Sequence, residues 1–110
     1  MASMTPGARV AVDEDQIEIA PASARTGRLA YAWVVNSTGA AVYLSVWSGT
    51  GTSRTETQRA GGPWLIPDGF AAPVLIEVRA ELGAVLAAHT AADLTGAPAS
   101  AIDVVPMWEH

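Results

Sequence analysis

The sequence predicts an all-β fold organised as a single-domain antiparallel β-sandwich, and three observations lead to this prediction. Apolar side chains alternate with other residues in several short segments, which is the period of a half-buried strand. Clusters of Gly, Pro, Asn, Asp and Ser separate these segments at intervals of about 8 to 12 residues, as in sandwiches. Half of the 110 residues are apolar and 15% are charged, so one domain of this length can bury a core without disulfides. We expect a sandwich of the immunoglobulin-like or prealbumin-like type.

The N-terminal part predicts a disordered segment followed by a hairpin. Residues 1–7 are mostly small or turn-forming and are expected to be disordered, which leaves residues 8–110 as the single domain. In residues 10–12 and 17–19, Val and Ile alternate with other residues on either side of the acidic residues 13–15. This pattern predicts two strands joined by a turn.

The segments 29–35 and 41–47 predict a second hairpin. Both are rich in the aromatic and β-branched residues that favour strands. The turn-forming residues 36–39, NSTG, lie between them. Trp33 shares a face with Leu29 and is expected in the core. One face of the second segment consists of Val42, Leu44 and Val46.

A polar segment, residues 48–62, separates Trp47 from the next apolar residues. Its GTGTSR sequence lacks the third glycine of a dinucleotide-binding loop, and no Lys follows as in a P-loop. Within it, residues 53–59 alternate Ser and Thr with charged or amide side chains. Because Thr favours strands and charges on an edge discourage pairing between sheets, this part predicts an exposed polar edge strand.

The C-terminal half predicts further strands and one ambiguous segment. Residues 73–81 alternate cleanly, with Glu and Arg on the side expected to face water. Residues 81–94 fit a strand opened by Gly83. They also fit a helix that ends near Gly96, so an α+β fold with one helix near 81–94 is the alternative. Residues 101–108 predict a last strand, placed at a sheet edge by its proline. In residues 73–81 the side chains expected to face the core are those of Val74, Ile76, Val78 and Ala80.

The composition excludes several kinds of chemistry. The chain has no Cys and no Lys, which removes disulfides, thiolate metal sites, Cys nucleophiles and Schiff-base catalysis. Only two His are present, and Asp13, Asp15 and Glu18 lack the spacing of a calcium loop, so we expect no metal site and no cofactor. The net charge is −5 and the Arg residues are scattered. Both features argue against binding to nucleic acid or to an anionic membrane.

The cellular location is expected to be cytoplasmic. The N-terminal sequence lacks the charged and apolar regions of a signal peptide, and no apolar run approaches the length of a membrane span. The Ala-rich, Lys-free composition is typical of a bacterial genome of high GC content.

Two tryptophans flank the polar segment and suggest a binding surface. An exposed Trp beside Arg resembles the side chains that contribute most to protein interfaces. We therefore expect binding to a protein surface or a ligand at these residues; a ligand pocket walled by the same tryptophans is the rival interpretation. The five residues are Trp47, Arg54, Glu56, Arg59 and Trp64.

The leading hypothesis is a non-enzymatic binding or assembly module that associates with itself or with a protein partner. Few catalytic residue types occur, and a high apolar fraction with few charges is typical of a chain partly covered by another subunit. The alternative is a small enzyme of the cyclase or isomerase type, which acts on a hydrophobic metabolite in an apolar pocket. A small apolar ligand fits this alternative, and its pocket would be lined by Tyr31, Trp33, Tyr43 and His89.

Overall fold

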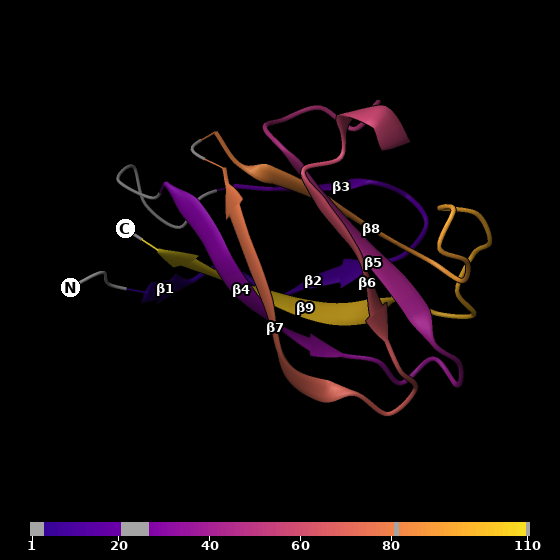
Figure 1. Cartoon of the computed structure of the whole chain (residues 1–110). Coiled ribbons are helices and arrows are strands. Elements are labelled where there is room, and N and C mark those ends of the chain that lie inside the picture. The colour runs from indigo at the N-terminus through magenta and orange to yellow at the C-terminus, as the bar shows by residue number, and fades with distance from the viewer. Residues whose placement is uncertain (1–3, 21–26, 81, 110) are drawn as a thin grey trace.

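Two antiparallel sheets face each other in a computed structural model that describes residues 4–20, 27–80 and 82–109 (Figure 1). This arrangement confirms the predicted β-sandwich. Sheet A contains β1 (Met4–Pro6), β2 (Val10–Val12), β4 (Arg28–Val35), β7 (Ala71–Arg79) and β9 (Ile102–Glu109). Sheet B contains β3 (Ile17–Ile19), β5 (Val42–Ser48), β6 (Gly61–Ile66) and β8 (Ala84–His89).

The ambiguous segment near residues 81–94 contains a strand, and its described residues contain no helix. Within it β8 pairs with β5 on one side and with β3 on the other. The side chains of Val85 and Ala87 lie on the face opposite to the core, as strand alternation requires. In the described part of the chain the one helical element is η1 (Glu56–Gln58), a single 3₁₀ turn, and no helix there is long and apolar enough to cross a membrane.

The core lies between the inner faces of the two sheets. The side chains that alternate inward on β5 and β7 all belong to it, as the sequence predicts, and those of β5 are fully buried. Trp108 of β9 is among the largest side chains that are completely shielded from solvent. Burial of this apolar surface is the main force that holds the sheets together.

Both predicted hairpins are wrong, because each pair of neighbouring strands is divided between the two sheets. β2 pairs with β9 while β3 pairs with β8; likewise β4 lies in sheet A and β5 in sheet B. The buried Asn36 stabilises the second crossing: its Nδ2 donates to the carbonyl oxygens of Ala40 (2.9 Å) and Ile66 (3.0 Å). The turn residues therefore form a corner between the sheets rather than a hairpin.

A bulge in β4 reverses the faces that the sequence predicts for this strand. The register shifts between Leu29 and Tyr31 relative to both neighbouring strands. Leu29 is buried, but beyond the bulge Ala32 and Val34 face the core. Trp33 faces outward with 46% of its surface exposed, so the prediction of a core tryptophan is wrong.

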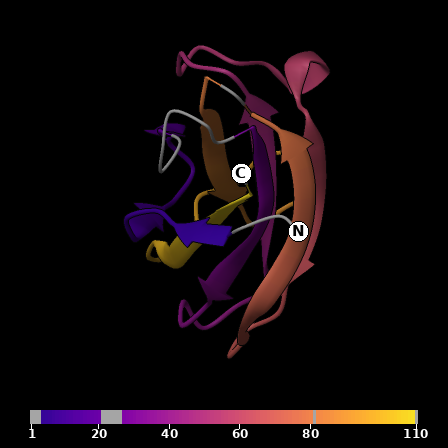
Figure 2. The same ribbon diagram turned by 90° about the vertical axis from the view of Figure 1, so that its left-hand side faces the viewer.

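Two further predictions near the chain ends are corrected. Residues 4–6 of the segment expected to be disordered form β1, which pairs with β9; residues 1–3 lie outside the described part. β9 is not at an edge, because β4 pairs along one side and β1 and β2 along the other. Its Pro106 lies in register between these two short strands, where the ladder is interrupted. β1 and the end of β9 lie together, at the left in Figure 1 and toward the viewer in Figure 2.

Residues 53–59 do not form the predicted edge strand. They contain η1, which lies at the top of both views (Figures 1 and 2), and the amide of Gln58 donates to the carbonyl of Thr55 at 3.0 Å. The segment folds back over the outer face of sheet B, where the carbonyl of Thr55 accepts a hydrogen bond from the indole Nε1 of Trp47 at 2.7 Å. A contact between the loop and a buried indole replaces the expected strand pairing.

Candidate functional site

The outer face of sheet A presents a continuous area of apolar side chains, which we call the apolar face. Cross-strand register places Tyr31 between Leu75 and Met107, and Trp33 between Pro73 and Val105. Leu75 is 65% exposed. A shallow groove of about 390 Å³ runs between the side chains of β4 and β7. The apolar face consists of Tyr31, Trp33, Val35, Ala71, Pro73, Leu75, Val105 and Met107.

Charged side chains border the apolar face at both ends. At one end Arg28 forms ion pairs with Glu109 (3.1 Å) and Glu77 (3.7 Å). At the other end Arg9 pairs with Asp103 at 2.8 Å. An apolar centre with a charged border is the usual composition of a protein interface.

Sheet A has β7 at one edge and the short strands β1 and β2 at the other, and the β7 edge is poorly suited to adding another strand. β7 occupies this edge, and Pro73 in its middle lacks the N–H that pairing requires. Glu77 has a positive φ of 55°, and the register of β7 with β4 shifts nearby. Both features discourage edge-to-edge pairing at β7.

The predicted surface around the two tryptophans of the polar segment is not assembled. Trp47 is 1% exposed and lies on the outer side of sheet B, beneath the 48–60 segment. Trp64 is half-buried and packs against the core on the inner side. Arg54 and Arg59 are half-buried, and Glu56 begins η1. Trp47 is therefore corrected from an exposed to a buried residue.

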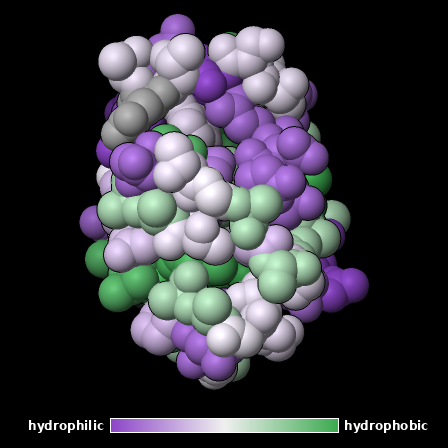
Figure 3. Space-filling view, turned by 90° about the vertical axis from the view of Figure 1, so that its right-hand side faces the viewer, coloured by the Kyte–Doolittle hydropathy of each residue, from purple (hydrophilic) through white to green (hydrophobic). Residues whose placement is uncertain are grey.

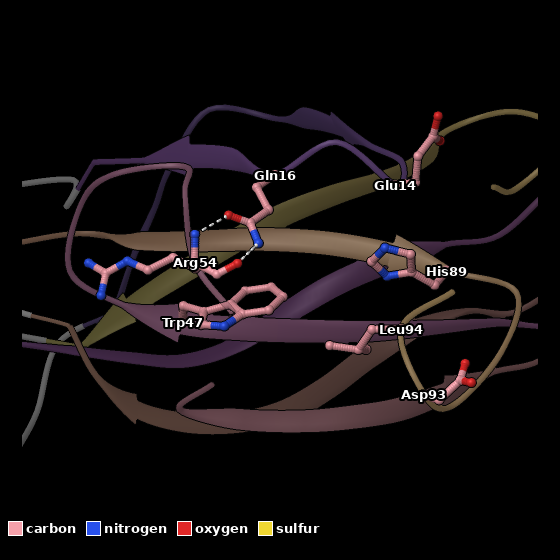
Figure 4. Close-up of a pocket in the computed structure, with 7 residues that line it drawn as sticks. All are labelled: Glu14, Gln16, Trp47, Arg54, His89, Asp93 and Leu94. Carbon is pink, nitrogen blue, oxygen red and sulfur yellow. Dashed lines mark hydrogen bonds between the residues drawn. The ribbon is translucent and has the colours of Figure 1, made fainter. Parts of the chain in front are cut away.

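A second candidate site lies on the outer face of sheet B and does include two of these residues. A pocket of about 240 Å³ lies here, and its lining includes Trp47, Gln16, Leu94 and His89 (Figure 4). We call it the sheet B pocket. Figure 3 views the molecule from the right-hand side of Figure 1; residues of intermediate hydropathy cover most of this side, with hydrophilic groups and a few strongly hydrophobic ones among them. The lining consists of Glu14, Gln16, Trp47, Arg54, His89, Asp93 and Leu94.

The four residues of the alternative aromatic pocket are divided between opposite faces of the sandwich. Tyr31 and Trp33 belong to the apolar face of sheet A. Tyr43 and His89 are cross-strand neighbours on the outer side of sheet B. The hydrophobic core lies between the two pairs, so these four side chains do not line one cavity.

The surroundings of His89 in the sheet B pocket shift the pKa of its imidazole. Burial lowers the pKa of His89 below its ordinary value, although the nearby carboxylates of Glu14 and Asp93 act in the opposite direction. Burial therefore favours the neutral form of the imidazole. Across the described residues, no group of three or more His, Cys, Asp or Glu side chains is placed to hold a metal ion.

Sequence reasoning missed Leu75 and Pro73 in the first site and Gln16 and Leu94 in the second. A signal for Leu75 was present, since period-two alternation places it on the same outward side as Glu77. An apolar side chain at an outward position indicates an unusual surface. Gln16 and Leu94 gave no signal, because their neighbours in the pocket come from distant segments.

Comparisons with known proteins identify no relative. No protein-family model matches the chain, and no curated protein and no solved structure is significantly similar to it. The functional argument therefore rests on the residues of the two candidate sites.

Proposed function

We propose that the protein is a non-enzymatic binding module that associates with a second copy of itself through the apolar face. The observation that supports this proposal is the set of aromatic and aliphatic side chains that project outward from three adjacent strands of sheet A. Association would remove this surface from water, which is favourable in proportion to the apolar area covered.

The size of the apolar face favours reversible association. Strands lie about 4.8 Å apart and side chains on one face about 6.8 Å apart, so the eight positions of the apolar face cover roughly 260 Å². Exposed patches of this size are often functional, whereas stable interfaces bury about 800 Å² on each partner. The charged border must supply the rest of the contact, and association should depend on concentration.

The border charges suit a partner with the same surface. Arg28 and Arg9 contribute positive charge, and Glu77, Glu109 and Asp103 contribute negative charge. A two-fold axis places the same patch on both copies, so residues of one sign can face residues of the other. The enzyme alternative has no comparable support, since its four residues lie on opposite faces.

Sedimentation velocity of the whole chain from about 5 to 500 µM tests the proposal. The wild-type protein should shift from monomer to dimer, and Leu75→Glu should remain a monomer because it places a charge in the centre of the face. Leu65→Glu is the matched control: Leu65 is also exposed, on β6 of sheet B, and this variant should dimerise normally. A wild-type protein that stays monomeric throughout, or a Leu75→Glu variant that still dimerises, would refute the proposal.

A further inference from the structure

A long polar connection crosses the outer face of sheet B and covers a second apolar surface there. We propose that its residues 50–59, which we call the strap, open as a unit while both sheets stay folded, and that opening exposes the apolar surface around Trp47. This inference concerns the opposite sheet from the apolar face and does not depend on self-association.

The route of the strap is longer than its two ends require. β5 and β6 are adjacent antiparallel strands, which a turn of about two to five residues can join. Here twelve residues, 49–60, separate them. From β5 the chain passes to β3 at the opposite edge of sheet B, where the N–H of Gly51 donates to the carboxylate of Glu18 at 2.7 Å. It then returns to β6. Connections of about this length are uncommon in compact domains and are often functional.

The surface beneath the strap is a small apolar cluster that is separate from the main core. Trp47 of β5 packs with Val85 and Ala87 of β8 on the outer side of sheet B. Leu94 packs against this cluster. The three strand residues are at most 1% exposed, although they face away from sheet A. Such satellite clusters typically lie under long loops. Burial of Trp47 therefore depends on the strap and not on packing between the sheets.

Hydrogen bonds between polar groups hold the strap on this surface. The side-chain amide of Gln16 donates to the carbonyl of Arg54 (2.7 Å) and accepts from its backbone N–H (2.9 Å), next to Trp47 (Figure 4). The indole Nε1 of Trp47 donates to the carbonyl of Thr55 at 2.7 Å. The strap sequence, TGTSRTETQR, contributes no large apolar side chain. Because water can replace such hydrogen bonds at a small net cost, opening the strap is less unfavourable than separating the two sheets.

Hydrogen bonds within the strap make it a unit. The guanidinium of Arg54 donates to the carbonyl of Gly51 at 3.3 Å and to that of Thr50. Its positive charge is thus directed into the strap itself. In η1 the N–H of Gln58 donates to the carbonyl of Thr55 at 3.0 Å. These internal contacts can persist when the contacts to sheet B break, so we expect the strap to lift as one piece.

The strap is anchored at both ends and is free of backbone pairing between them. Before it, the N–H of Gly49 donates to the carbonyl of Gly83 at 2.9 Å. After it, the N–H of Ala60 donates to the carbonyl of Val46 at 2.8 Å. Within the described ranges, no backbone-to-backbone hydrogen bond joins residues 50–59 to a strand. Gly49 has a positive φ of 97°, which glycine adopts without strain, and a small residue at this point suits a hinge.

Native-state hydrogen exchange of the ¹⁵N-labelled whole chain, measured by NMR at several low urea concentrations, tests the inference. The reference is the slowest-exchanging group of amides in β4, a central strand that reports global unfolding. After correction for intrinsic rates, the Trp47 indole N–H should exchange at least about tenfold faster than this reference. Its exchange should also depend less on urea, because opening exposes less surface than unfolding. The amides of Gly51 and Arg54 should share the opening equilibrium of Trp47 within about threefold.

Two substitutions show whether the strap controls access to Trp47. Gln16→Ala removes hydrogen bonds that only the closed strap makes and should speed exchange of the Trp47 indole about five- to thirtyfold. The control, Thr52→Ala, changes an exposed residue of the strap and should leave this exchange unchanged.

Three results would overturn the inference. The first is exchange of the Trp47 indole at the rate and with the urea dependence of the slowest β4 amides. The second is independent opening of Gly51 or Arg54, and the third is equal acceleration by Thr52→Ala and Gln16→Ala. Neither substitution lies on the apolar face, so this outcome is separate from that of the sedimentation test.

Discussion

Trp47 and Trp33 provide the sharpest test of the architecture, because their exposure is the reverse of what strand alternation predicts. Trp47 is 1% exposed and Trp33 is 46% exposed. A large aromatic side chain buries about 150–250 Å² when fully enclosed, worth about 4–6 kcal/mol at about 25 cal/mol per Å². Trp47→Ala leaves the Cβ but also creates a cavity, so we expect a loss of about 3–5 kcal/mol in the free energy of unfolding.

Trp33→Ala should cost much less. About half of this side chain is already exposed, and water can fill the space that the truncation leaves, so the expected loss is about 1–2 kcal/mol. The stability of a domain of this size is roughly 5–15 kcal/mol, and Trp47→Ala can therefore approach complete unfolding. Trp47→Phe is a milder second variant. It removes the donor to the carbonyl of Thr55 and should cost about 1–3 kcal/mol.

Urea unfolding monitored by far-ultraviolet circular dichroism measures these differences without relying on tryptophan fluorescence. The comparison should be made at concentrations where every variant is monomeric, because association also stabilises the folded state. Equal m-values would confirm that the variants unfold from the same compact state. If Trp33→Ala costs as much as Trp47→Ala, or if Trp47→Ala loses less than about 1 kcal/mol, the assignment of these two side chains to opposite environments is incorrect.

Three further perturbations follow from single contacts or conformations. Gln16→Ala should lower the free energy of unfolding by about 1–2 kcal/mol and should speed hydrogen exchange of the Arg54 amide, which would lose its acceptor. Unchanged exchange would contradict the hydrogen bond between Gln16 and Arg54. Gly83→Ala should cost more than Gly39→Ala in urea unfolding. Both glycines have positive φ, but a Cβ at Gly83 would lie 2.7 Å from a carbonyl oxygen of β3, whereas at Gly39 it meets no atom within 4 Å. Burial lowers the pKa of His89 below 6.5, so in the pH range between the two pKa values the unfolded chain binds a proton that the folded protein does not. The free energy of unfolding should therefore fall as the pH decreases below about 6.5 and level off below the pKa of the folded state. This pH dependence should disappear in His89→Gln. Chemical denaturation between pH 7.5 and 5.5 checks the sign, and a wild-type protein that gains stability on acidification would disprove it.

The predictable part of the two candidate sites was small, and the reason is geometric. Alternation depends only on neighbouring residues, so it identifies which side chains share a face. It does not identify what covers that face. Trp47 and Trp64 both flank the polar segment in sequence, yet one lies on the outer and the other on the inner side of sheet B. The bulge between Leu29 and Tyr31, which places Trp33 on the surface, has no distinct signature in LAYAWVV.

The sequence by itself determined that this chain forms strands and which side chains of β5 and β7 face inward, since period-two alternation is a local consequence of the pleat. The tertiary structure alone decided the partners of each strand. Turn residues such as Asn36 are compatible with a hairpin and with a corner between sheets, and the choice depends on burial summed over the whole core. The same long-range packing left the face around Trp33 and Leu75 uncovered and placed the 48–60 segment over Trp47 and Gln16, because contacts between distant segments depend on all strands at once.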